Sequence, residues 1–165
     1  MAGGMTNLVD VLKARSASME KMRQLLEEER QSILAFDTER LREAVARKVE
    51  VATVMEELDG TCRTLLKQEG ARHGLTGTVT LSPLIACTPK PAREELASLQ
   101  ETLAARAEEL RGMIADNRRL LESSLATVGR SLAFFQSRFT VAETYGGTGR
   151  MVERSAGSGL LRKEL

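Results

Sequence analysis

The sequence has 165 residues, of which 42% are hydrophobic, 28% are charged and only 3% are aromatic. This length fits one domain, the apolar content excludes a wholly disordered chain, and the abundance of helix-favouring residues over aromatic ones predicts an all-α fold. The 24 basic and 23 acidic residues leave a formal net charge of +1, so nucleic acid is not expected as a partner.

Residues 6–36 are predicted to form the first helix, with Asn7 as its N-cap. The apolar positions follow one another at alternating spacings of four and three residues, which is the heptad pattern of a coiled coil. The resulting seam consists of Leu8, Leu12, Arg15, Met19, Met22, Leu26, Glu29, Ile33 and Phe36.

Residues 38–69 are predicted to form the second helix. Extending the first seam beyond Phe36 reaches only charged positions, so the chain is expected to turn at Asp37, which would cap the next helix. This turn gives an antiparallel helical hairpin. The second seam consists of Leu41, Ala44, Lys48, Val51, Met55, Leu58, Cys62 and Leu65.

Two charged residues on these seams are expected to meet. A turn at Asp37 places Glu29 level with Lys48. Two alternatives remain open: each side chain extends separately to solvent, or the two form an ion pair that sets the register of the hairpin. Gly60 interrupts the second helix and should weaken it by ~1 kcal/mol.

Residues 70–90 are predicted to be a flexible linker, because Gly, Thr and Pro are frequent there and charges are few. A longer third helix is predicted over residues 91–145, with Glu94 and Glu95 in its first turn. Its seam consists of Leu96, Leu99, Leu103, Arg106, Leu110, Met113 and Asn117, followed after a stutter by Leu121, Leu125, Val128, Leu132, Phe135 and Phe139.

These elements predict an elongated, coiled-coil-like bundle, with one three-helix domain over residues 1–147 and a flexible tail over residues 148–165. A third helix of ~50 residues would reach ~75 Å, whereas hairpin helices of ~31 residues span ~45 Å. Unless the helix bends back, its last ~20 residues would therefore lack a partner in their own chain. Four of the five aromatic residues lie there, namely Phe134, Phe135, Phe139 and Tyr145. Such an apolar stripe predicts either a docking site or a dimer seam.

The sequence offers no arrangement for catalysis or for binding a cofactor. Cys62 and Cys87 are expected to be reduced thiols, and His73 is the only histidine, so no zinc-binding cluster is expected. The start lacks the pattern of a signal peptide, and no apolar run approaches the ~18 residues of a membrane span. We therefore expect a soluble cytoplasmic protein that is not an enzyme and does not insert stably into membranes.

Several segments carry a resemblance to a known family. They are Leu25-Leu26 with Glu28, then Asp37, Leu41 and Lys48 at the hairpin, Asn117-Arg118-Arg119-Leu120-Leu121, Ser124-Leu125, and Thr144-Tyr145-Gly146 followed by Gly149. With these residues the chain resembles the FlgN family of flagellar type III export chaperones over most of its length.

The resemblance implies a bacterial chaperone that binds the C-terminal segments of the hook–filament junction proteins FlgK and FlgL. It would prevent their premature association and deliver them to the export gate. It also implies that Tyr145, the match to the tyrosine of the family's Thr-Tyr-Gly segment, docks on the gate component FlhA. The expected client-binding residues are Leu121, Leu125, Val128, Leu132, Phe134, Phe135 and Phe139. The alternative is a structural adaptor or scaffold that self-associates through the same stripe, for example as a homodimer.

Overall fold

The computed structural model describes residues 2–144, with side chains for residues 3–138. This part of the chain forms four helices and no strand, which confirms the predicted all-α fold. The chain divides into two compact units, Met1–Leu121 and Glu122–Leu165. A single domain over residues 1–147 stays a prediction, and the predicted tail lies outside the described residues.

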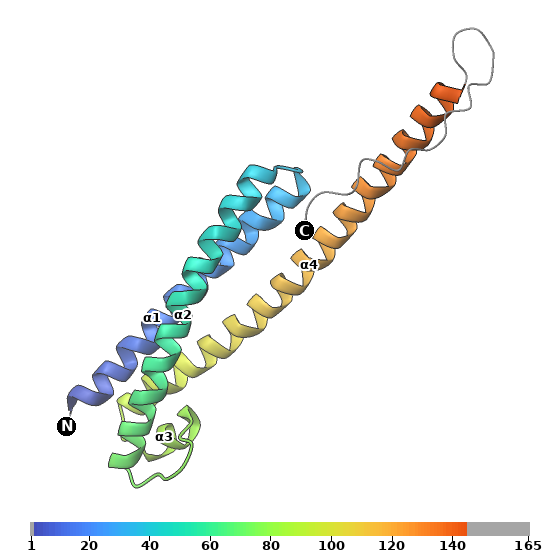
Figure 1. Ribbon diagram of the computed structural model, residues 1–165. Helices are drawn as coiled ribbons and strands as arrows, with labels where there is room; N and C mark the ends of the chain where they lie inside the picture. Colours follow the sequence, from blue (N-terminus) through green and yellow to red (C-terminus); the bar gives the residue numbers. More distant parts are fainter. Residues whose placement is uncertain (1, 145–165) are drawn as a thin grey trace. The chain divides into compact units, whose positions relative to one another are not determined.

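The first two helices form the predicted antiparallel hairpin (Figure 1). They are α1 (Ala2–Leu34) and α2 (Thr38–Arg72). Asp37 caps α2 as predicted, because its side-chain carboxylate accepts a hydrogen bond of 3.1 Å from the backbone N–H of Arg40. This bond satisfies one of the N–H groups that have no partner within the helix.

The predicted bounds of the first helix were wrong at both ends. The helix begins at Ala2 and not at residue 6, so Asn7 lies inside it and is not an N-cap. Met5 packs against the core, and the absent side chain of Gly4 leaves room for the side chains of Glu69 and Arg72 on α2. Phe36 is not a seam residue, because it lies in the turn with a φ of 53° and is 61% exposed.

The region predicted as a linker contains a short helix, α3 (Leu81–Cys87), and α2 extends three residues beyond its predicted end. Leu84 is fully buried, and Leu81 and Ile85 pack against the core beside it. Pro83 is tolerated because the N–H groups of the first helical turn have no intrahelical acceptor. The Thr88 hydroxyl donates to the carbonyl oxygen of Leu84 at 2.7 Å, which closes the helix.

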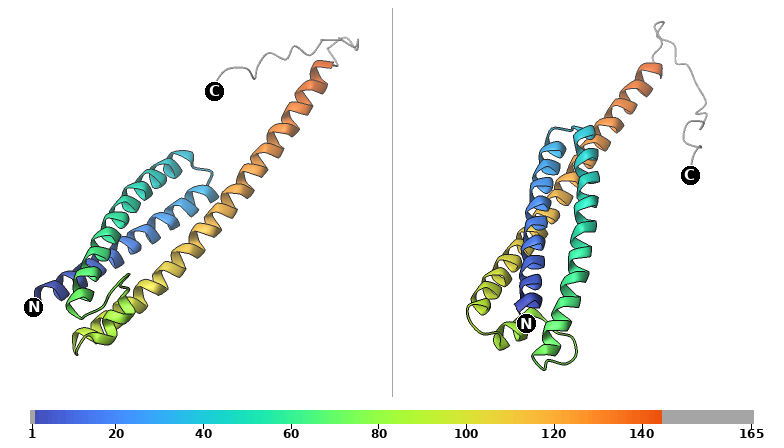
Figure 2. Two further views of the ribbon diagram at one scale, coloured as in Figure 1. Left: turned by 60° about the horizontal axis from the view of Figure 1, so that its bottom comes forward. Right: turned by 90° about the vertical axis from the view of Figure 1, so that its left-hand side faces the viewer.

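The last helix, α4, runs from Ala92 to Thr144, close to its predicted bounds of 91–145. In the first unit it lies beside α1 and parallel to it, as Figures 1 and 2 show. Successive contacts establish the direction: Lys13 pairs with Glu95 at 2.7 Å, and Asn117 donates to the Leu26 carbonyl at 2.7 Å. The connection through α3 therefore reverses the chain direction at the end of the hairpin at which α1 begins and α2 ends.

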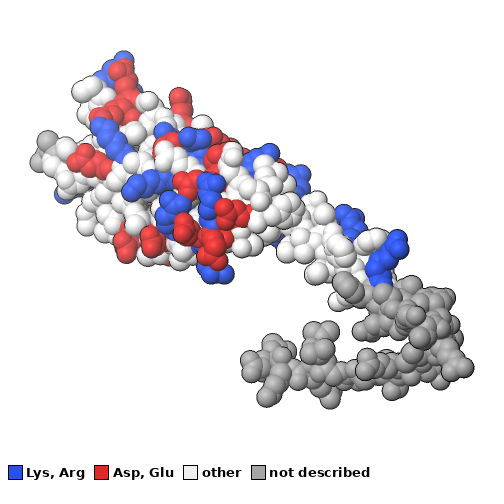
Figure 3. All heavy atoms as spheres, turned by 90° about the horizontal axis from the view of Figure 1, so that it is seen from above, with Lys and Arg blue, Asp and Glu red and all other residues white. Residues whose placement is uncertain are grey.

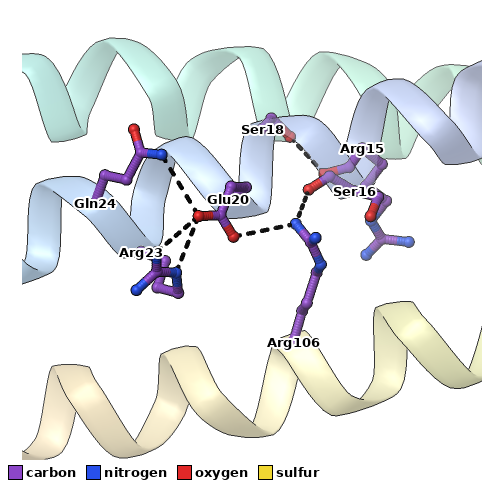
Figure 4. Close-up of polar contacts among 7 residues, drawn as sticks. All are labelled: Arg15, Ser16, Ser18, Glu20, Arg23, Gln24 and Arg106. Atoms are coloured by element: carbon purple, nitrogen blue, oxygen red, sulfur yellow. Dashed lines mark hydrogen bonds and ion pairs between the residues drawn. The ribbon is translucent and has the colours of Figure 1, made fainter.

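Between these two contacts, Arg106 of α4 reaches across to α1 (Figure 4). Its Nη1 donates to the carbonyl oxygen of Ser16 at 2.7 Å and lies 3.5 Å from Oε2 of Glu20. Glu20 also accepts hydrogen bonds from Arg23, which are the main cause of its lowered pKa. The stabilisation that the ionised Glu20 carboxylate gains from these hydrogen bonds is therefore present above the ordinary pKa of a glutamate. It is lost as the pH falls through the lowered pKa.

The buried face follows the predicted seams. On α2 every predicted seam residue is buried or partly buried, and on α4 the same holds from Leu96 to Asn117. The core cluster consists of Leu8, Val9, Leu12, Met19, Met22, Leu26, Cys62, Leu84, Leu96, Leu103 and Leu110. Because α1 supplies six of these eleven residues, it is the central helix of the first unit.

A polar triad, which consists of Glu29, Lys48 and Asn117, joins α1, α2 and α4 at the end of the core that is nearer to the turn at Asp37. Lys48 Nζ lies 2.7 Å from Oε1 of Glu29, which shows that the two residues pair. Asn117 Nδ2 donates to the second carboxylate oxygen of Glu29 at 2.9 Å and to the Leu26 carbonyl. Asn117 is 5% exposed, so its amide requires these acceptors.

Replacing Asn117 with Asp should destabilise the protein by about 3 kcal/mol at neutral pH, because a second carboxylate would then face Glu29 without a donor. Like charges in one site raise the pKa of one carboxyl group. The loss relative to wild type should therefore shrink as the pH is lowered towards ~4. Urea unfolding of both proteins at several pH values measures the difference.

Asn117→Leu is the matched control, since it removes the amide without adding charge. It should cost less than Asn117→Asp at neutral pH and show no recovery in acid. Equal unfolding free energies for the two variants at every pH would mean that Asn117 does not face the Glu29 carboxylate.

Gly60 and Gly70 of α2 offer a second matched pair. A Cβ at Gly60 would meet no atom within 4 Å, whereas one at Gly70 would lie 2.6 Å from Cγ2 of Val79. Gly60→Ala should therefore stabilise the protein by up to ~1 kcal/mol, and Gly70→Ala should destabilise it by about 1–3 kcal/mol. Thermal unfolding followed by circular dichroism measures both changes. If Gly70→Ala raised the melting temperature as much as Gly60→Ala, the segment around Val79 would not pack against α2.

Candidate functional site

The predicted docking stripe is a row of exposed apolar side chains on α4. Leu125, Val128, Leu132 and Phe135 lie at successive spacings of three, four and three residues, which places them on one face of the helix. Their exposed fractions are 63%, 43%, 57% and 56%. We call these four residues the apolar stripe. Side chains of this size are seldom exposed as a continuous row unless another molecule covers them.

Phe134 extends this surface onto the neighbouring face of α4. Its ring makes an edge-to-face contact with that of Phe135, with the centroids 5.9 Å apart and an interplanar angle of 70°. The Cζ atom of Arg138 lies 5.2 Å from the Phe134 centroid, within the range of a cation–π interaction. The two rings therefore present one aromatic edge beside the stripe, with a guanidinium group over it.

The charge around the stripe differs from that of the hairpin. Between Glu122 and Glu143 the sequence contains Arg130 and Arg138 but no aspartate or glutamate. Figure 3 shows blue and red side chains intermixed over the broad part of the molecule, whereas the narrow arm that leads to the grey residues shows blue and white on this face. The apolar stripe therefore lies in a locally basic segment of a nearly neutral chain.

Leu121 is the remaining predicted client-binding residue with a described side chain, and its assignment stays a prediction. It is the last residue of the first unit and is 37% exposed. It borders a hollow of about 200 Å³ in which the polar triad forms part of the wall. The lining residues are Glu29, Ile33, Lys48, Ile114, Asn117, Arg118 and Leu121.

Two predicted site residues have side chains that lie outside the described part of the structure. The backbone of Phe139 belongs to α4, but its side chain lies outside the described part. Tyr145 also lies outside the described residues. Their assignments stay predictions.

A groove between α1 and α2 was not predicted from the sequence. This groove has a volume of about 470 Å³ and is largely apolar. On α1 the small residues Ala14, Ala17 and Ser18 follow one another at spacings of three residues and one residue, and they leave room beside the seam of α2. This spacing was the signal in the sequence from which the groove could have been predicted. The lining residues are Ala14, Ala17, Ser18, Lys21, Glu50, Val51, Val54 and Leu58.

Among the side chains that the structure describes, no group of three or more His, Cys, Asp or Glu residues could hold a metal ion. Cys62 is buried, and desolvation raises the pKa of its thiol, whereas Cys87 is exposed. A raised pKa lowers the thiolate fraction and makes Cys62 a poor nucleophile.

None of the helices between Ala2 and Thr144 has a stretch apolar and long enough to cross a membrane.

The sequence model of the FlgN protein family matches residues 1–153, which is most of the chain and includes all four helices. Neither a curated protein nor a solved structure matches the chain significantly.

Proposed function

Because this chain belongs to the FlgN family, a family of flagellar export chaperones rather than of enzymes, we propose that it binds the C-terminal segments of FlgK and FlgL. In this proposal it acts in the bacterial cytoplasm, prevents the two junction proteins from associating prematurely and delivers them to the type III export gate. The client-binding site in this proposal is the apolar stripe together with Leu121, Phe134 and Phe139.

The observation that carries this proposal is the exposure of the apolar stripe. An amphipathic helix in the client could lay its own apolar face along Leu125, Val128, Leu132 and Phe135, as helices do when they bind a groove or another helix. Covering this face would remove apolar surface from water on both partners. A client held in this way could not use the same face to associate with another copy of itself.

Such a mechanism needs no chemistry beyond binding. Affinity would come from the burial of leucine, valine and phenylalanine side chains, with the aromatic edge of Phe134 and Phe135 providing the largest contact area. Release would require only that the export gate compete for the client or the chaperone. No nucleotide, metal or covalent step enters this proposal.

Self-association through the apolar stripe, as in a scaffold or homodimer, is the alternative. It would bury the same residues and would make them inaccessible to a client. Size-exclusion chromatography with light scattering separates the two functions. A chaperone stays small alone and forms a defined complex with a client segment, whereas a scaffold forms larger species alone.

Replacing Leu132 and Phe135 together with Ala should weaken binding of the FlgK and FlgL C-terminal segments by roughly 100-fold, because two large anchors are truncated. Helicity should not fall, because both side chains are more than half exposed and Ala favours the helix. Isothermal titration calorimetry measures the affinity, and circular dichroism measures the helicity.

The control removes a similar number of exposed apolar side chains from another helix. Val45 and Val49 of α2 are 43% and 63% exposed, and replacing both with Ala should leave client affinity unchanged. If the Leu132/Phe135 variant bound as tightly as wild type, the client would bind elsewhere, and the groove between α1 and α2 would be the next surface to examine.

Tyr145 is the proposed contact to the export gate. Tyr145→Ala should therefore bind the FlgK segment with wild-type affinity but lose binding to the cytoplasmic domain of FlhA, as measured by surface plasmon resonance with each partner immobilised in turn. Tyr145→Phe distinguishes the roles of the ring and the hydroxyl group. Weakened client binding by Tyr145→Ala would instead assign this residue to the client site.

A further inference from the structure

The aromatic edge of α4 lies between two arginines. Arg130 precedes Phe134 by four residues and Arg138 follows it by four, so all three lie on one side of the helix, one turn apart. Arg138 lies over the Phe134 ring at 5.2 Å from the centroid. Arg130 Nη2 donates to the Thr127 hydroxyl at 3.3 Å. Arg138 is therefore held over an aromatic ring and Arg130 beside a hydroxyl group, each by a contact within its own helix.

Neither arginine has a carboxylate nearby in sequence. Elsewhere on α4 an arginine typically has an acidic residue within one turn, as in the pair formed by Arg119 and Asp116 at 2.7 Å. The segment from 123 to 142 contains no acidic residue. The local excess of positive charge is thus a property of this surface, because the whole chain carries a formal charge of only +1.

This charge distinguishes between two occupants of the surface. A second copy of the same segment would bring two more arginines and no carboxylate, so like charges would oppose pairing. A helix with aspartate or glutamate beside its apolar face would instead complement the arginines. Arginine also forms bidentate hydrogen bonds with carboxylates, which adds geometric specificity to the attraction.

We infer that the partner of this surface is an acidic amphipathic helix, with carboxylates that pair with Arg130 and Arg138 while its apolar face covers the stripe. This inference rests on the proposed chaperone function, since it names the chemistry of the client segment. The apolar contacts supply most of the affinity, and the arginines select the partner and set its orientation on α4.

A charge-swap experiment on the full chain tests this pairing. The probes are two synthetic helical peptides with the same leucine and isoleucine heptad seam, one flanked by glutamate and the other by lysine. Wild type should bind the glutamate peptide at least tenfold more tightly, and the difference should shrink at high salt because ions screen exposed charges. The double variant Arg130→Glu, Arg138→Glu should reverse the preference.

The control is the double variant Arg42→Glu, Arg63→Glu, which changes the net charge equally at exposed positions on α2. It should keep the wild-type preference, and the Leu132→Ala, Phe135→Ala variant should weaken binding of both peptides. Circular dichroism of each variant confirms that the helices are retained.

The outcomes separate this inference from the proposed function. Equal affinity of wild type for the two peptides, or a preference for glutamate that survives in the Arg130/Arg138 variant, would overturn the acidic partner, even if FlgK and FlgL segments bind at the stripe. A reversed preference in that variant, with no binding of FlgK or FlgL segments by wild type, would support the acidic partner and overturn the proposed clients.

Discussion

The hydrogen bonds of Asn117 are the constraint on which the arrangement of the first unit depends. Its amide is buried and reaches both the Leu26 carbonyl and the Glu29 carboxylate, which is itself paired with Lys48. Sliding α4 by one helical turn would move the amide by ~5.4 Å and leave these groups without partners. Apolar contacts alone tolerate such a shift, because leucines repeat along every seam. The polar triad therefore selects one register for all three helices.

The same heptad spacing has two different uses along α4. From Leu96 to Leu110 it produces buried core residues, and from Leu125 to Phe135 it produces an exposed row. Charge is the feature that separates the two segments, because the acidic residues of the first are absent from the second. A surface that is apolar, aromatic and basic at once suits a partner that is amphipathic and acidic, which is how the stripe and its arginines combine into one proposal.

Much of the fold could be predicted because its signals are local. The break in heptad phase located the turn at Asp37, and the seams identified the buried faces of α1, α2 and the first part of α4. The short helix α3 was missed because its stability depends on the burial of Leu84 in a core formed by other helices. The direction of α4 was equally inaccessible, since a heptad pattern reads the same both ways. Individual contacts of Arg106 and Asn117 decide it.

The candidate site was predictable to a different extent. The composition of the stripe and its lack of an obvious partner are visible in the sequence, and its described side chains are exposed. That Leu121 also borders the hollow beside the polar triad depends on how α4 lies against α1, which no local pattern encodes. The groove between α1 and α2 was missed for a similar reason, because alanines beside a seam have the same appearance whether or not a hollow forms over them.

The difference between short-range and long-range contacts has a consequence for synthesis on the ribosome. Glu29 and Lys48 are 19 residues apart, whereas Leu26 and Asn117 are 91 residues apart. Closing the longer loop costs about 1.4 kcal/mol more in chain entropy, so the hairpin gains its contacts more cheaply. The hairpin is also complete once Arg72 has been made, and at ~5–20 residues per second Asn117 follows only after several seconds. During that interval the nascent hairpin exposes the apolar face that α4 later covers, so the chaperone is itself briefly a chain at risk of aggregation.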